Sequence, residues 1–179
     1  MGGIALGTVI GAFSAIKVTM TSMPEMVAIF NGFGGGASAL VASAELFKYL
    51  SDKKYYVAEL LSINIEQKLE LIKLDLPELL VMAQSDLLII MITIVLSVII
   101  GSLTFTGSFI AWGKLQGKIS GQPITYTGQN IINGFILLGV IVAGYVFVLN
   151  PDNLIAFSII LIIGLLLGIL SLLPIGGAD

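Results

Sequence analysis

Cysteine, histidine and arginine are all absent from this 179-residue sequence. Without cysteine there can be no disulfide, no thiolate nucleophile and no Cys-ligated metal or iron–sulfur cluster. Without histidine, the commonest metal ligand and the usual proton shuttle are missing, and a Ser-His-Asp triad cannot form within the chain. The sequence therefore predicts no metal site, and we assign no catalytic residue.

Charge of either sign is scarce. Eight lysines and eleven acidic residues make up 11% of the chain and leave a net charge of -3. A nucleic-acid-binding surface needs a basic patch, so no nucleic-acid partner is expected. Hydrophobic residues reach 57%, and the mean hydropathy of +1.07 is far above that of an ordinary globular domain. The expected surroundings of the chain are a lipid bilayer.

Long hydrophobic runs are abundant. A helix needs about 20 apolar residues to cross a hydrocarbon layer about 30 Å thick. Five segments approach or reach this length, of which the first is short: Gly2 to Ile16, Met26 to Phe47, Leu87 to Ala111, Ile131 to Leu149 and Leu154 to Leu173. The last three carry no charged residue, which disfavours the alternative of buried helices in a soluble core. We predict an all-α, polytopic transmembrane helix bundle of about five spans.

Residues 48–86 form an unusual connection between the second and third spans. Apolar residues recur there at steps of three and four, with acidic and lysine residues between them, a pattern typical of amphipathic helix. We predict an amphipathic helical connection that lies on the membrane surface or on the other spans.

The glycine-rich segment from Gly32 to Ala37 matches the alanine variant of the dinucleotide-binding fingerprint. That fingerprint requires a preceding strand and a helix N-terminus at the pyrophosphate, whereas these glycines lie inside an apolar span. We therefore predict no cofactor-binding residue in the chain. Glycines at four-residue spacing more often allow close helix packing in membranes, and three sets have this spacing: Gly3, Gly7 and Gly11; Gly32 and Gly36; and Gly164 and Gly168.

Two of the predicted spans carry a polar or small face. On the second span the face comprises Asn31, Gly35, Ser38, Ala42 and Glu45, and on the third it comprises Ser97, Gly101, Thr104 and Ser108. If the two faces meet, Asn31, Ser38, Thr104 and Ser108 should surround a chain of water molecules. The alternative is that the hydroxyls only bond carbonyls of their own helix, and that Glu45 reaches water at the interface. Since an amide or carboxyl inside a bilayer needs a partner, Asn31 and Glu45 are candidate functional residues.

Three segments resemble, in order and spacing, the membrane part of the β subunit of proton-translocating NAD(P) transhydrogenases. They run from Lys17 to Gly32, from Gly101 to Lys118 and from Ile175 to Asp179. Residues 49–86 fall outside the resemblance and look longer than the connection usual in the family. The resemblance implies that residues 1–179 are part of a transmembrane domain, with further spans of the subunit beyond it.

The resemblance also implies the activity: hydride transfer between NAD(H) and NADP(H) coupled to proton movement across the membrane. Both nucleotides would bind other domains of the complex, so no cofactor is expected in this chain. Expected partners are the remaining β-subunit spans, the NADP(H)-binding domain and the α subunit, in a dimer of the whole complex in a bacterial inner membrane.

Roles for single residues follow from the same resemblance. The family has His or Asn at the position of Asn31, in the conducting pathway, and the amide found here cannot carry a proton but can orient water. We predict a proton pathway along Asn31, Ser38, Glu45, Thr104 and Ser108. Asp179 matches a residue that faces the NADP(H) domain, which suits coupling. The alternatives are a secondary transporter for a small solute, which should show inverted repeats with broken helices, and a structural membrane subunit.

Overall fold

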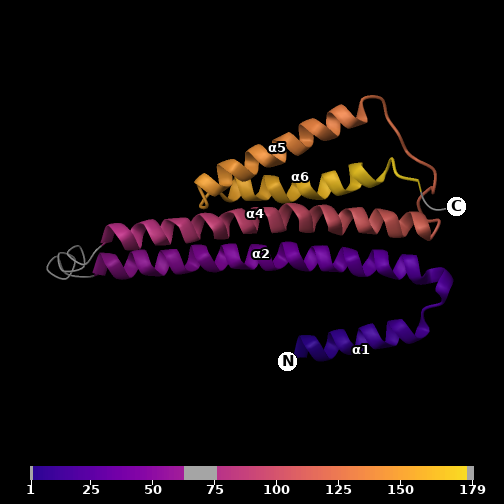
Figure 1. The fold of residues 1–179 in the computed structure, drawn as a ribbon, viewed down its shortest axis with the longest axis horizontal. Coiled ribbons are helices and arrows are strands. Elements are labelled where there is room, and N and C mark those ends of the chain that lie inside the picture. Colours follow the sequence, from indigo (N-terminus) through magenta and orange to yellow (C-terminus); the bar gives the residue numbers. More distant parts are fainter. Residues whose placement is uncertain (1, 63–75, 177–179) are drawn as a thin grey trace.

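The structure is a computed structural model that describes residues 2–62 and 76–176, with the side chains of residues 2–53 and 87–176. Every regular element in these ranges is helical: α1 (Gly2–Lys17), the 3-10 helix η1 (Met20–Ser22), α2 (Met23–Ser62), α4 (Leu76–Leu115), α5 (Gln129–Leu149) and α6 (Leu154–Leu172) (Figure 1). Within the described residues, four helices are long and apolar enough to cross a membrane, and α1 is a shorter apolar helix. The predicted helical bundle of about five spans is confirmed.

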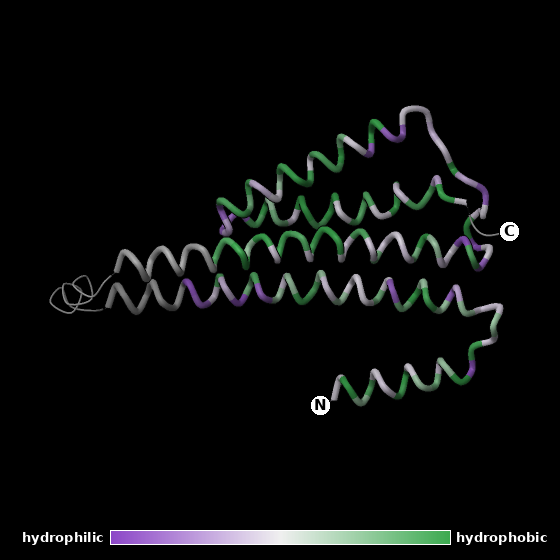
Figure 2. Tube along the Cα trace, in the orientation of Figure 1, coloured by the Kyte–Doolittle hydropathy of each residue, from purple (hydrophilic) through white to green (hydrophobic). Residues whose placement is uncertain are grey.

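Helix α4 lies at the centre of the bundle. It runs antiparallel to α2 on one side and contacts α6 on the other, while α5 packs on α6 and diverges from it toward one end (Figure 1). Met91, Val98, Val140, Phe147 and Ile160 are fully buried where α4, α5 and α6 meet. Hydrophobic colour dominates α6 and the adjoining part of α4, whereas α2 is paler (Figure 2). The apolar core is centred where α4 meets α5 and α6, and it also includes Ala42 and Leu46 of α2.

The two longest helices extend beyond the predicted spans. Helix α2 continues past Phe47 to Ser62, and α4 begins at Leu76. No glycine or proline interrupts the chain between Ala37 and Ser62, and Pro77 lies in the first turn of α4, where its missing N–H removes no intrahelical bond. The described parts of residues 48–86 therefore prolong the two spans. Residues 63–75 lie outside the described chain, and the relation of this connection to a membrane stays a prediction.

Turn residues set the helix ends on either side of α5. Gly117 and Gly128 have φ of 69° and 80°, a left-handed conformation that favours glycine, and they flank the connection from α4 to α5. At the start of α6, the Asn153 side chain accepts a hydrogen bond of 3.1 Å from the Ala156 N–H. These local features separate α4, α5 and α6 into three helices.

Close packing through glycine is confirmed for two of the three predicted sets. Gly164 and Gly168 lie directly against the side chains of Ser102 and Thr106 on α4, and Gly32 and Gly36 lie against Ser108, Phe109 and Phe105 on the same helix. A Cβ on Gly3, Gly7 or Gly11 would meet no atom of the described chain within 4 Å. Helix α1, which has no buried residue, makes no such packing with the described part of the chain.

The bundle has two distinct ends. At one end lie the turn from α1 to α2, the end of α4 and the segment that follows α6 (Figure 1). At the other, Lys53 Nζ of α2 lies 2.5 Å from Asp152 Oδ2 in the turn between α5 and α6. Both side chains of this ion pair are largely exposed, so it adds little to stability but ties α2 to the α5–α6 turn.

Candidate functional site

The two predicted polar faces meet at the interface of α2 and α4. Asn31 on α2 donates a hydrogen bond of 2.9 Å from Nδ2 to Ser108 Oγ on α4. Ser108 is buried, at 8% exposure, while Asn31 is exposed on the surface of this chain. An amide within a membrane span costs several kcal/mol unless it is paired, and the Ser108 hydroxyl supplies the partner.

An open pocket of about 530 Å³ borders this hydrogen bond, and we call it the Asn31 pocket. Helix α2 contributes Pro24, Val27, Ala28 and Asn31, helix α4 contributes Leu103, Thr104, Gly107, Ser108 and Ala111, and α6 contributes Leu172. Its polar side chains are those of Asn31, Thr104 and Ser108. The pocket has room for several water molecules beside groups that can hydrogen-bond to them.

A second pocket of about 680 Å³, the Glu45 pocket, lies farther along the same interface. Its polar lining consists of Ser38, Glu45, Thr93 and Ser97. Ser38 lines this pocket and not the Asn31 pocket, so the grouping of Ser38 with Asn31, Thr104 and Ser108 around one chain of water molecules stays a prediction. Seven residues of α-helix separate Asn31 from Ser38, a rise of about 10 Å, so a shared helix face does not place them in one cavity.

Gly35 and Gly101 lie between the two pockets. A Cβ on Gly35 would fall 2.8 Å from the Gly101 carbonyl oxygen and from Thr104 Cβ, and a Cβ on Gly101 would fall 2.6 Å from the Gly35 carbonyl oxygen. Real Cβ atoms do not approach other atoms this closely, so both positions require glycine. The two backbones are in contact here, and the predicted continuous hydrated path past this contact stays a prediction.

Several hydroxyls follow the alternative pattern of bonding backbone carbonyls. Ser102 Oγ donates to the Val98 carbonyl at 2.6 Å, and Thr93 Oγ1 donates to the Ile89 carbonyl at 2.8 Å, both within α4. Thr106 Oγ1 also reaches the Leu165 carbonyl of α6 at 2.7 Å. The Ser108 hydroxyl differs from these three, because within the described residues its partner is a side chain of α2, that of Asn31.

Lys114 is a residue that the sequence analysis did not single out. It lies in the last turn of α4, is 6% exposed, and donates hydrogen bonds from Nζ to the carbonyls of Leu172, Leu173 and Ile175 at 3.2, 2.7 and 2.5 Å. A lysine in the last turn of a helix is common, so sequence alone gave no reason to choose it. Its acceptors lie about sixty residues later in the chain, beyond the reach of any local pattern.

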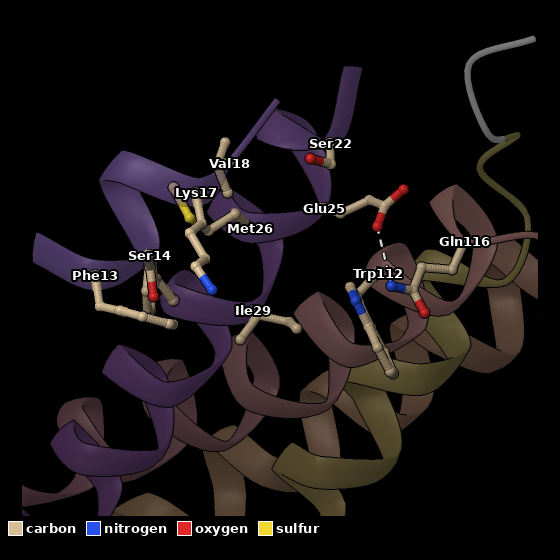
Figure 3. A pocket seen from close by; sticks show the side chains of 11 residues that line it. Phe13, Ser14, Lys17, Val18, Ser22, Glu25, Met26, Ile29, Trp112 and Gln116 are labelled. Carbon is tan, nitrogen blue, oxygen red and sulfur yellow. Dashed lines mark hydrogen bonds between the residues drawn. The ribbon is translucent and has the colours of Figure 1, made fainter. Parts of the chain in front are cut away.

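A third pocket, of about 410 Å³, opens where α1 ends, α2 begins and α4 ends (Figure 3). Glu25 Oε2 accepts a hydrogen bond of 2.9 Å from Gln116 Nε2 across its mouth, and Lys17 Nζ lies 4.6 Å from the centre of the Phe13 ring. This pair joins the start of α2 to the end of α4. Asp179, predicted to act in coupling, lies outside the described residues.

Comparison with known proteins places this helical arrangement in a family. The model of the NAD(P) transhydrogenase beta subunit family matches residues 1–179. The chain belongs to this family. It is also 32% identical over 176 residues to a protein of Rhodospirillum rubrum named NAD(P) transhydrogenase subunit beta. The protein of the same name from a specified strain of this species is equally similar. The matched region covers 98% of this chain and 32% of the relative, so the chain spans about a third of the relative's length.

Family membership and the apolar helices together make the chain an integral membrane protein of the transhydrogenase family. The resemblance inferred from the three sequence segments is confirmed by a match that also includes residues 49–86. The Asn31 pocket and the Glu45 pocket therefore lie between two spans of a transhydrogenase β subunit.

Proposed function

We propose that this chain is part of the proton-conducting membrane domain of a proton-translocating NAD(P) transhydrogenase, and that it couples proton movement to hydride transfer between NAD(H) and NADP(H). The observation that carries the proposal is the hydrogen bond between Asn31 and Ser108 inside a pocket that Thr104 also lines. A paired amide and two hydroxyls between two apolar helices support it, because polar side chains in a membrane span are costly and are therefore candidate functional residues.

The side chains of the Asn31 pocket act on water and not as proton carriers. A neutral amide neither takes up nor releases a proton at physiological pH, and serine and threonine hydroxyls do not either. They can hold water molecules in line through donor and acceptor atoms, and protons then move along the ordered water. With its amide nitrogen bonded to Ser108, Asn31 is held in one orientation beside the space that the water would occupy.

The Glu45 pocket forms the second half of the proposed path. Its carboxyl group can exchange protons with water near one membrane face, and Ser38 lies on the same helix face between Glu45 and the glycine contact. Because Gly35 and Gly101 close the interface between the pockets, protons cross only when α2 and α4 separate there or change their relative rotation. A closed contact between two half-channels prevents a proton leak when hydride transfer is not under way.

Other parts of the complex perform the hydride transfer in this proposal. NAD(H) and NADP(H) bind other domains, and the chain assembles with the remaining β-subunit spans, the NADP(H)-binding domain and an α subunit, in a dimer of the whole complex. The membrane is the bacterial inner membrane, and the first relatives found are bacterial. Asp179 would face the NADP(H) domain and couple the state of that domain to the spans. The transporter alternative is not favoured, because the described lengths of α2 and α4 contain no break at mid-membrane.

The test uses the complete enzyme reconstituted into vesicles, with Asn31→Leu as the variant. Leucine keeps the approximate size of the side chain and removes its donor and acceptor, so proton uptake and coupled NADP(H) turnover should both slow while nucleotide binding stays unchanged. Asn133→Leu is the matched control, because its amide lies on α5 and accepts a hydrogen bond from Tyr126, away from the α2–α4 interface. Wild-type proton uptake in Asn31→Leu vesicles would show that this face serves packing and that the path runs elsewhere.

A further inference from the structure

The ammonium group of Lys114 is the most completely enclosed charge among the described side chains. Only 6% of Lys114 is exposed, and its acceptors are carbonyl oxygens and not a carboxylate. The ammonium has three N–H groups, and each has one carbonyl to bond: those of Leu172, Leu173 and Ile175. The last carbonyls of a helix lack partners within the helix and carry its negative dipole end, so they suit a buried cation.

The three carbonyls bound by Lys114 belong to the end of α6 and the first residues beyond it. Pro174 lies among them and cannot continue the helix, so the chain direction here is set by contacts with other elements. Lys114 supplies one contact, and the Ile124 N–H supplies another by donating to the Leu173 carbonyl at 3.0 Å. The segment that follows α6 is thereby fixed to α4 and to the connection after it.

Leu172 connects this fixed segment to the Asn31 pocket. Its carbonyl accepts a hydrogen bond from Lys114, and its side chain lines the pocket together with Asn31 and Ser108. A Cβ on Gly107 would lie 3.0 Å from Leu172 Cδ2, so the leucine side chain is in close contact with α4 at the residue that precedes Ser108. A displacement of the chain at Leu172 or Leu173 must therefore alter the wall of the pocket.

We propose that Lys114 is a positioning residue that holds the segment after α6 in register with the Asn31 pocket, so that movement of this segment changes the pocket. The inference rests on the proposed function, because it concerns how proton movement and hydride transfer are linked. Lys114 moves no proton and touches no nucleotide. The three hydrogen bonds of its ammonium fix the segment after α6 to the end of α4. They form a contiguous physical link between that segment and the Asn31 pocket.

The test measures protons taken up per hydride transferred by the complete enzyme in vesicles. In Lys114→Met the apolar stem remains, but the three hydrogen bonds to carbonyls are lost. We expect the ratio of protons to hydrides to fall about threefold or more, with nucleotide KM values unchanged. Lys118→Met is the matched control, since Lys118 is an exposed lysine close by that contacts the Trp112 ring, and its ratio should equal that of the wild type.

A purely structural role would give a different result. It would lower the amount of folded enzyme and reduce proton uptake and hydride transfer together, leaving their ratio at the wild-type value, and this outcome contradicts the proposal. If Lys114→Met does not assemble, Lys114→Arg decides, because arginine keeps the charge but its planar fork cannot repeat the arrangement of three N–H groups around one nitrogen. A wild-type ratio in Lys114→Arg then also contradicts the proposal.

The same assay separates this inference from the proposed function on which it rests. If the wild-type enzyme takes up no protons during hydride transfer, the proposed function itself fails. If the wild type couples the two processes and Lys114→Met couples them equally well, the proposed function stands and only the role of Lys114 is wrong.

Discussion

Gly35 and Gly101 bring the backbones of α2 and α4 into direct contact, with the Gly35 carbonyl oxygen 2.6 Å from the place that a Cβ on Gly101 would take. The contact lies between the Asn31 pocket and the Glu45 pocket, which separates the polar residues of the interface into two groups. This one point fixes the distance between the two helices that carry the candidate site. Any larger side chain there must move a helix, since the obstructing atoms are backbone atoms and the Cβ atoms of Thr104 and Ala39, which cannot rotate away.

Gly101→Ala should therefore destabilise the protein by about 1–3 kcal/mol, the usual cost of an overpacked contact. Chemical denaturation in detergent micelles, followed by loss of helical circular dichroism, measures the change. Gly139→Ala on α5 is the control, because a Cβ there would meet no atom of the described chain within 4 Å. The control should be neutral or stabilising by up to about 1 kcal/mol, since alanine is the better helix former. Equal stability of the two variants would mean that α2 and α4 are not in backbone contact.

Thr106→Val tests the attachment of α4 to α6. The change removes the hydrogen bond from Thr106 Oγ1 to the Leu165 carbonyl while keeping the size of the side chain. Hydrogen bonds between helices in membranes contribute about 0.5–1.5 kcal/mol, and a loss of that size is expected in the same denaturation assay. Ser158→Ala, which removes an exposed hydroxyl bonded to its own helix at Leu154, should change stability by less than about 0.5 kcal/mol. The prediction fails if Thr106→Val is as stable as the wild type.

The purified chain alone should bind neither NAD(H) nor NADP(H). Its one glycine-rich fingerprint, Gly32 to Ala37, is part of the continuous helix α2 and offers no helix N-terminus to a pyrophosphate. Isothermal titration calorimetry of the detergent-solubilised chain with NADPH should show no saturable heat, and the complete enzyme in the same buffer serves as the positive control. Saturable binding in the micromolar range would contradict the assignment of both nucleotides to other domains.

Much of the fold follows from hydrophobic periodicity and length. The runs from Leu87 to Ala111 and from Ile131 to Leu149 fall inside helices of the structure, and the run from Leu154 to Leu173 exceeds α6 by one residue. The ends of α2 and α4 could not be predicted in the same way, because a change from apolar to amphipathic composition alters the surroundings of a helix without breaking it. A helix ends where hydrogen bonding or backbone conformation changes, as at Gly117, and residues 48–62 contain no such residue.

The candidate site was predictable as a set of helix faces but not as a set of distances. Helical spacing correctly placed Asn31 opposite Ser108, because each lies on the polar face of its helix. The same spacing also grouped Ser38 with them, but a face extends along the whole helix, and Ser38 lines the Glu45 pocket instead. Lys114 was missed because its importance depends on how the end of α6 packs, which no pattern local to α4 encodes.

In the proposed function, Asn31 and Ser108 act as one unit on the proton path. A double-mutant cycle tests it, with the rate of proton uptake measured in vesicles that contain the complete enzyme carrying Asn31→Leu, Ser108→Ala or both changes. Each single change should slow uptake by about tenfold or more, because removing one partner leaves the other polar group unpaired. The double variant should be no slower than the slower single variant, since the two groups form a single hydrogen bond. Independent effects that multiply in the double variant, or wild-type uptake in either single variant, would contradict the claim.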